Sequence, residues 1–276
     1  MTEDRRSWVS ESLPAQMREA LGSGLPASKL WSVLLDVLEA RARSRTPASL
    51  REQWTKDRFV QPCYVDQRTL HEVDGHLLAA ATAFEAVELS PLAPLGVCSA
   101  VALASQNKIV STARGTEVIS DPTNVLALEC ARRLKENGSL HVRLASSHRC
   151  VRAQAIPNRP GFAAHFRMFC LVSAGHEREN REFLSGALAE HINTHLAALD
   201  RLGQHGYLTK HRNVRLLATE RNAQLAERVA TTVNADVHHQ ALDHPYYDGI
   251  RFMIDVPIGQ GGDILDSHAA EDRHDH

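Results

Sequence analysis

A β-hairpin is predicted between residues 140 and 175, and this stretch constrains the fold more than any other. The first strand carries Arg152 beside Gln154, and a loop rich in Pro and Gly follows over residues 155–164. The returning strand opens with His165 and Phe166 and then becomes apolar. Such a hairpin places a guanidinium, an amide and an aromatic ring on one platform, which suits a phosphate and a planar base.

The rest of the chain mixes helical and strand patterns without a regular β-α-β alternation, which predicts an α+β domain with an antiparallel sheet flanked by helices. Of the 276 residues, 43% are hydrophobic, so the chain has enough apolar side chains for one large core. We expect a helical N-terminal segment over residues 1–56, the main domain over 57–266 and a disordered polar tail over 267–276.

The N-terminal segment carries two helix-start signals. Ser28 is a plausible N-cap for one helix, and Thr46 precedes Pro47 at the start of another. The first of these helices has an apolar stripe at helical spacing, formed by Leu30, Val33, Leu34, Val37 and Leu38. The stripe predicts packing on the main domain or on a partner subunit.

Several further elements follow from local patterns. A short strand is expected over residues 59–66, a helix over 69–89, a loop over 90–96 and short strands with turns over 97–120. A helix should begin near Pro122, capped by Asp121 or Ser120. A long amphipathic helix is expected over 180–202, followed by a strand, a helix and a last strand within 243–256.

Charge and cysteine usage exclude several classes of function. The net charge of -2 and the pI of about 6.8, with cations and anions interspersed, give no electrostatic case for nucleic acid. The five cysteines form no CxxC pair and are typical of buried thiols in a reducing compartment. No signal peptide and no membrane-length apolar run are found, so a cytoplasmic protein without membrane association is expected.

Metal and nucleophile chemistry find little support. His191 and His195 lie one helical turn apart, a ligand-compatible spacing, yet no carboxylate or cysteine completes a set. We therefore predict no metal site and interpret most histidines as surface residues. No GxSxG sequence is present, and no cysteine lies in a recognisable nucleophile motif.

Three pieces of the sequence, in order, resemble class II aminoacyl-tRNA synthetases. Val151-Arg152-Ala153-Gln154 is similar to the Phe-Arg-x-Glu of the family's motif 2, and the strand from Phe166 to Gly175 continues that motif. The turn Ser120-Asp121-Pro122-Thr123 is similar to the Arg-Pro-Glu turn of the histidyl branch. The segment from His244 to Phe252 resembles its Leu-Asp-Tyr-Tyr-Thr-Gly segment. The resemblance covers roughly residues 57–268 and extends to the ATP phosphoribosyltransferase regulatory subunits of that branch.

The resemblance implies a six- or seven-stranded antiparallel sheet, a homodimer, and ATP with Mg²⁺ as ligands. Arg152 would bind the ATP α-phosphate and the activated carboxylate, and act as the catalytic arginine. Phe166 would stack on adenine, with Phe169 as the alternative ring, and Gln154 and His165 would belong to the same nucleotide site.

For the substrate, the resemblance implies a pocket made from two separate segments. Asp121 and Thr123 would contribute from the turn before the helix, where the family glutamate faces a substrate ammonium. Tyr246 and Tyr247 would line the amino-acid pocket.

The sequence departs from the family at several positions, and two functions are expected from the departures. Gln154 and Thr123 replace family glutamates, Leu242 stands near a family arginine, and no motif 3 arginine is recognisable. Aminoacylation of tRNA is therefore not expected. The first function is a paralog that binds a nucleotide or a small carboxylate or amino-acid-like ligand, with adenylate-forming ligase chemistry if active. The alternative is a non-catalytic regulatory subunit that binds a small effector and a partner enzyme.

Overall fold

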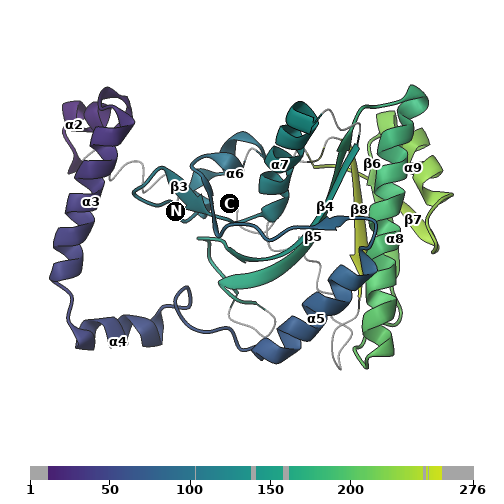
Figure 1. Ribbon diagram of the computed structural model, residues 1–276, viewed down its shortest axis with the longest axis horizontal. Helices are drawn as coiled ribbons and strands as arrows, with labels where there is room; N and C mark the ends of the chain where they lie inside the picture. The colour runs from purple at the N-terminus through teal and green to yellow at the C-terminus, as the bar shows by residue number, and fades with distance from the viewer. Residues whose placement is uncertain are drawn as a thin grey trace.

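A computed structural model describes residues 12–102, 104–137, 141–157, 162–244, 247 and 249–256. The N-terminal helices come first, then a helix and strands around a central hairpin, then a second small sheet (Figure 1). The helices are α2 Ala15–Glu19, α3 Ala27–Arg43, α4 Pro47–Lys56, α5 Gln67–Ala80, α6 Val97–Ala100, α7 Pro122–Asn137, α8 Glu182–Gln204 and α9 Ala223–Ala230. The strands are β1 Glu85–Ala86, β2 Leu92–Pro94, β3 Thr116–Val118, β4 His141–Val151, β5 His165–Gly175, β6 Asn213–Ala218, β7 Val237–Ala241 and β8 Ile250–Asp255. Short irregular helices are η1 Ala20–Gly24, η2 Gln106–Lys108, η3 Glu179–Arg181 and η4 Glu220–Asn222.

The predicted hairpin is confirmed as β4 and β5, which pair antiparallel from His141↔Gly175 to Val151↔His165. Because side chains alternate along each strand, the hairpin has two distinct faces. One face packs on α7 through a cluster of Leu126, Cys130, Val142, Leu144 and Cys170. The opposite face packs on the C-terminal end of α5 and the residues after it, through Ala81, Phe84, Ala145 and Leu171 with Leu78 and Phe169.

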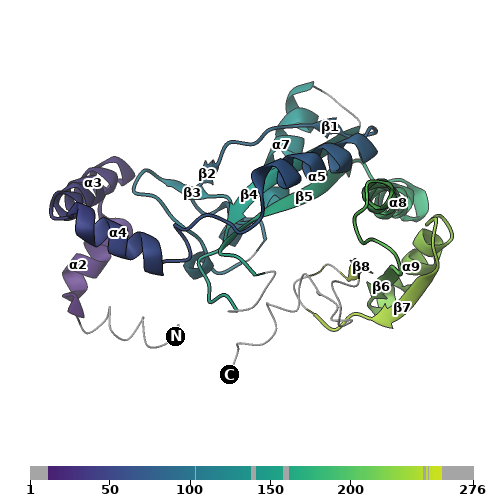
Figure 2. The ribbon, with the colours of Figure 1, turned by 90° about the horizontal axis from the view of Figure 1, so that it is seen from below.

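The helix α8 lies between the hairpin and the second sheet, as Figure 2 shows. On the hairpin side, Nε2 of His191 lies 2.9 Å from Oγ of Ser173 in β5. The His195 ring lies 5.7 Å from the Phe169 ring of β5 and 5.9 Å from the Phe252 ring of β8. The second sheet adds a core cluster of Ala189, Ile192, Leu196, Val214, Leu216, Ala226, Val229 and Val233. The long amphipathic helix predicted over 180–202 therefore packs against the hairpin on one side and against the second sheet on the other.

The N-terminal helices form an arm at one end of the molecule (Figure 1). The predicted Thr46 cap is confirmed, because Oγ1 of Thr46 accepts from the backbone N–H of Ser49, whose Oγ in turn accepts from the N–H of Thr46. The Ser28 cap is wrong: α3 begins at Ala27, two residues before the predicted start, with Pro26 at the N-cap position, so Ser28 lies inside the helix. The Trp31 ring would lie 3.3 Å from a Cβ built at Gly115, so α3 contacts the chain immediately before β3.

The strand expected over residues 59–66 is wrong. That segment consists of turns and coil, with Tyr64 96% exposed. Oδ1 of Asp57 accepts from the N–H of Phe59 and bends the chain, and Pro62 has no N–H to give to a sheet. At the other end, Oδ1 of Asp66 accepts from the N–H of Arg68 and caps α5, so side-chain contacts at both ends outweigh the apolar pattern of the segment.

The sheets are smaller than the family resemblance implies. The described residues form three sheets, ordered β1-β4-β5, β2-β3 and β7-β6-β8, in place of one six- or seven-stranded antiparallel sheet. Two of the pairings, β1 with β4 and β6 with β7, are parallel. The mixture of helices and antiparallel hairpins that defines an α+β fold is confirmed.

The region 97–100 is helical rather than extended, and a buried carboxylate is the reason. Glu117, which is 0% exposed, accepts backbone N–H groups from Gly96 (2.8 Å) and Cys98 (3.0 Å) and so caps α6. Burial alone would raise the pKa of Glu117, but hydrogen bonds from Gln106 and from these backbone groups outweigh it and hold the pKa below its usual value.

The half-buried histidines of α8, His191 and His195, predict a pH-dependent stability. Burial, and then the charge of His195, lowers the pKa of His191 to about 4, and burial lowers the pKa of His195. A histidine in the unfolded chain has a pKa of about 6.5. Between that pH and the lower pKa of the folded state, the unfolded chain binds protons that the folded protein does not bind, and this favours unfolding. We expect the free energy of unfolding to fall as the pH drops from 6.5 toward 4, by about 2 kcal/mol for His191 alone by pH 5.

Urea unfolding at pH 7, 6 and 5 measures this slope. The His191→Gln variant should lose part of it, whereas the control His238→Gln, on exposed β7, should keep it. Equal slopes in all three proteins would contradict burial as the cause.

Candidate functional site

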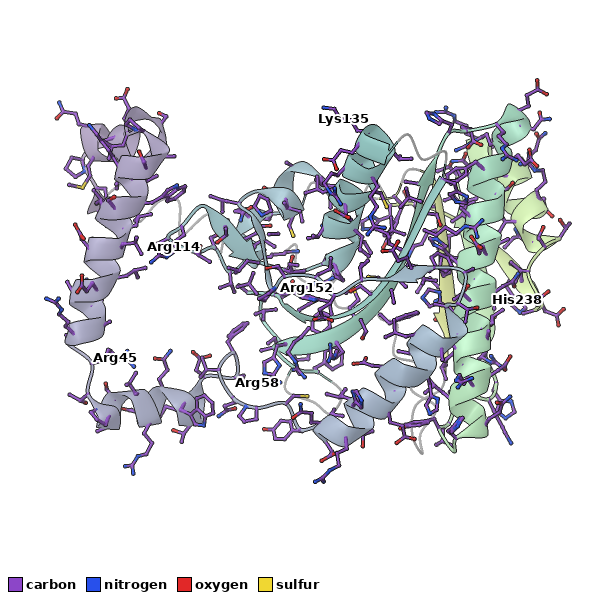
Figure 3. All side chains as sticks on the ribbon, viewed as in Figure 1. Arg45, Arg58, Arg114, Lys135, Arg152 and His238 are labelled. Carbon is purple, nitrogen blue, oxygen red and sulfur yellow. The ribbon has the colours of Figure 1, made fainter. Side chains whose placement is uncertain are left out.

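The candidate site is built around Arg152, immediately after β4 (Figure 3). Its Nε lies 3.3 Å from the carbonyl oxygen of Ser120, to which it donates. Its Nη2 lies 3.8 Å from Oδ2 of Asp121, and both side chains are partly exposed, at 20% and 25%. A half-buried guanidinium held by a carbonyl and a carboxylate has a fixed orientation, and its planar edge can exchange the carboxylate for the oxygens of an anionic ligand.

The turn before α7 fixes the position of Asp121. Its Oδ1 accepts from the N–H of Thr123 at 3.0 Å and from Oγ1 of Thr123 at 2.6 Å, and Pro122 occupies the first helical position. This settles the choice of cap in favour of Asp121, because Oγ of Ser120 lies 2.9 Å from Sγ of Cys98 instead. One carboxylate therefore caps α7 and faces Arg152.

An aromatic ring lies beneath the guanidinium. Cζ of Arg152 is 5.4 Å from the centre of the Phe166 ring, a cation–π distance. Phe166 is the cross-strand partner of Cys150, and Arg152 follows Cys150 by two residues. Strand alternation thus places Arg152 and Phe166 on the same face.

The same alternation sends two other predicted site residues to the opposite face. Phe169 packs in the α5 cluster and against His195. Nδ1 of His165 lies 2.6 Å from Nη1 of Arg149, and its Nε2 lies 2.7 Å from the carbonyl oxygen of Gln61. The structure therefore brings Arg152, Phe166 and Asp121 together, with Thr123 beside them, and leaves Phe166 as the ring next to the guanidinium.

The remaining predicted residues lie further along the chain. Gln154 is half-buried two residues after Arg152. Tyr246 lies outside the described residues. Tyr247 precedes β8, with its ring 4.7 Å from Cζ of Arg251 and 5.5 Å from the His244 ring.

Arg58 was not foreseen as part of this region. It donates to the carbonyl oxygens of Ile156 (3.1 Å), Pro157 (3.3 Å) and Phe162 (3.0 Å). These bonds tie the connection after α4 to both ends of the loop that leaves Arg152. A single arginine in a coil segment gives no sequence signal for such a contact.

The thiol below the site is inert. Burial, and then the charge of Asp121, raises the pKa of Cys150 to about 12, with Arg152 opposing the shift. A thiol with that pKa stays protonated at neutral pH and is a poor nucleophile. The chemistry of the platform is therefore binding of an anion beside a flat apolar ring.

The two α8 histidines serve the core. Nδ1 of His195 lies 2.8 Å from the carbonyl oxygen of His191, and His191 contacts Ser173 as described above. Within the part of the chain that the structure describes, no group of three or more His, Cys, Asp or Glu side chains is placed to hold a metal.

Comparisons with known proteins find similarity in structure but not in sequence. No family model matches, and no curated protein matches by sequence. Among solved structures, threonyl-tRNA synthetase ThrRS-1 of Aeropyrum pernix superposes with a TM-score of 0.51 at 12% identity, over 72% of this chain and 48% of that one. The RNA-binding domain of threonyl-tRNA synthetase from Cryptosporidium parvum gives 0.50 at 13% identity, over 67% and 50%. This chain has a class II synthetase-like fold.

Other similar structures belong to the histidyl branch. An ATP phosphoribosyltransferase regulatory subunit/histidyl-tRNA synthetase from Bacillus halodurans gives a TM-score of 0.45 at 18% identity, over 61% of this chain and 45% of that chain. The chain thus spans about half the length of the structures it matches. The predicted resemblance to class II synthetases is confirmed for the fold. In addition, none of the described helices is long and apolar enough to cross a membrane.

Proposed function

We propose that this chain binds a nucleotide, or a small carboxylate or amino-acid-like ligand, at the Arg152–Phe166 platform. The observation that carries the proposal is the guanidinium of Arg152 lying 5.4 Å above the Phe166 ring at the end of the hairpin. A planar guanidinium matches two phosphate or carboxylate oxygens, and the ring offers a stacking surface for a base. If the site is catalytic, adenylate formation is the reaction class that this pair suits.

Magnesium would arrive with the nucleotide. Asp121 is the carboxylate that faces Arg152, and a single carboxylate together with phosphate oxygens is a usual way for proteins to hold Mg²⁺.

Aminoacylation of tRNA is not part of this proposal. The positions that resemble family glutamates carry Gln154 and Thr123, and neither is a carboxylate that could hold a substrate ammonium. Leu242, near the place of a family arginine, is 8% exposed and contributes an apolar side chain instead of a charge.

Titration calorimetry with ATP and Mg²⁺ tests the platform. The Arg152→Gln variant should bind at least about tenfold more weakly, because a charge-assisted hydrogen bond contributes about 1.5–3 kcal/mol. The Phe166→Leu variant should lose roughly fivefold through lost stacking of about 1 kcal/mol. Phe169→Leu is the matched control, since its ring lies on the opposite face of the same strand, and should bind as the wild type does. Failure of the wild-type protein to bind millimolar nucleotide would sink the proposal.

Substitution of Asp121 should strengthen nucleotide binding, whereas substitution of Arg152 or Phe166 should weaken it. Without Mg²⁺, its carboxylate only competes with an incoming phosphate for Arg152, so Asp121→Asn should strengthen binding of metal-free ATP roughly fivefold, for about 1 kcal/mol of removed competition. The asparagine retains an oxygen that can cap α7, so the turn should survive. Unchanged or weaker nucleotide binding, measured by the same calorimetry without Mg²⁺, would show that the anion does not approach Arg152.

We also propose, as a second candidate, a regulatory or partner-binding role for the arm. Its apolar side chains are exposed: Val33 44%, Val37 51%, Leu38 55%, Leu50 52% and Trp54 53%. The three on α3 lie at helical spacing and form an exposed apolar stripe, which marks an association surface more often than a solvated one. Both the expected homodimer and a partner enzyme would use it.

Light scattering coupled to size exclusion tests the arm. Val37→Asp should convert a dimer to a monomer without loss of stability, because Val37 is half exposed in the single chain. Ser32→Asp, an exposed position of the same helix away from the stripe, is the matched control and should leave the mass unchanged. A wild-type protein that is already monomeric, or a V37D protein that stays dimeric, would rule out α3 as a homodimer surface.

A further inference from the structure

Arg251 in β8 has unused donors in an enclosed position. Its Nε and Nη2 are inaccessible to solvent, and neither has a hydrogen-bond partner among the described residues. The neighbouring Ile250 and Phe252 point into the core against α8, so alternation places Arg251 on the other face of the second sheet. Unpaired guanidinium N–H groups that are shielded from solvent are costly, and native proteins keep few of them.

A second arginine on the same face shows what these donors are suited to bind. Arg215 of β6 donates from Nε to Oδ2 of Asp255 at 2.6 Å and from Nη2 to Oδ1 at 2.9 Å. This is a side-on, bidentate pair with a carboxylate. Arg251 presents the same two atoms, Nε and Nη2, without a carboxylate.

The described strands supply no spare carboxylate to this face. The side chains that alternate onto it are Asn213, Arg215, Leu217, His238, Gln240, Arg251, Met253 and Asp255. Asp255 is the one acid among them, is 5% exposed and is already held by Arg215. An anion for Arg251 therefore has to come from outside this set.

Tyr247 covers the guanidinium from one side. Its ring centre lies 4.7 Å from Cζ of Arg251, a cation–π distance. A turn at Gly249, with φ of +80°, positions Tyr247: the N–H of Gly249 donates to the carbonyl oxygen of Tyr247 at 2.6 Å. The carbonyl oxygen of Gly249 accepts from the N–H of Thr219 at 3.0 Å.

The geometry points to Arg251 as the binding site for the carboxylate of a small ligand, with the Tyr247 ring beside the ion pair. A carboxylate fits because its two oxygens match the Nε and Nη2 edge in the way that Asp255 matches Arg215. The site lies on the second sheet and does not depend on Arg152, so it stands apart from the proposed nucleotide platform.

Thermal unfolding with acetate as the probe tests this assignment. At about ten times its Kd, acetate should raise the Tm of the full chain by roughly 3–6 °C over potassium chloride at equal ionic strength. Inorganic phosphate at the same ionic strength should raise it less. The Arg251→Met variant should lose the acetate response. Its ligand-free Tm should rise, because an apolar side chain of similar length replaces a partly buried charge that has two unpaired donors.

Arg152→Gln separates the two sites, because it should lose nucleotide binding and keep the acetate response. Arg201→Met, an exposed arginine of α8, is the matched control and should also respond to acetate. An acetate response that survives Arg251→Met, a response to phosphate alone, or a lower ligand-free Tm in Arg251→Met would each overturn the assignment.

Discussion

The antiparallel register of β4 and β5 is the constraint on which the rest of the structure depends. It pairs Cys150 with Phe166 and Ser147 with Phe169, and so assigns the two rings to opposite faces. One face then joins the α7 side, where Arg152 meets Phe166 and the Asp121 turn. The other face receives α5 and α8. A slip of one residue would exchange these faces and separate the guanidinium from its ring.

The two arginines discussed above differ in how their charge is satisfied. Arg152 already has a carbonyl and a carboxylate on one side, so a ligand there competes with Asp121 but finds the guanidinium oriented. The inner edge of Arg251 meets no acceptor in the described part of the chain, so a ligand there would remove a cost that the folded protein carries. The first arrangement favours reversible binding with modest affinity, and the second favours a ligand that stabilises the fold.

Local patterns were sufficient for the parts of the fold that depend on local physics. The hairpin, the Asp121 turn, the Thr46 cap and the α8 stripe each follow from alternation, capping or helical spacing within a few residues. The choice between Phe166 and Phe169 stayed open because it depends on the register, which a single sequence does not fix.

What could not be predicted depends on contacts between distant residues. Glu117 turns residues 97–100 into a helix across a separation of about twenty positions, and Arg58 reaches a loop about a hundred positions away. The division into three small sheets depends on which strands pair in space, and short apolar runs in the sequence do not specify their pairing partners. The unpaired donors of Arg251 likewise could not be predicted from the sequence, because they depend on which residues surround the guanidinium in space.

A crystal structure of the protein soaked with ATP and Mg²⁺ tests the central claim most directly. The account predicts phosphate oxygens within hydrogen-bond distance of the Arg152 guanidinium, displaced from Asp121, and a base stacked on the Phe166 ring. Crystals that leave Arg152 bonded to Ser120 and Asp121, with no nucleotide on this face at millimolar concentration, would contradict it.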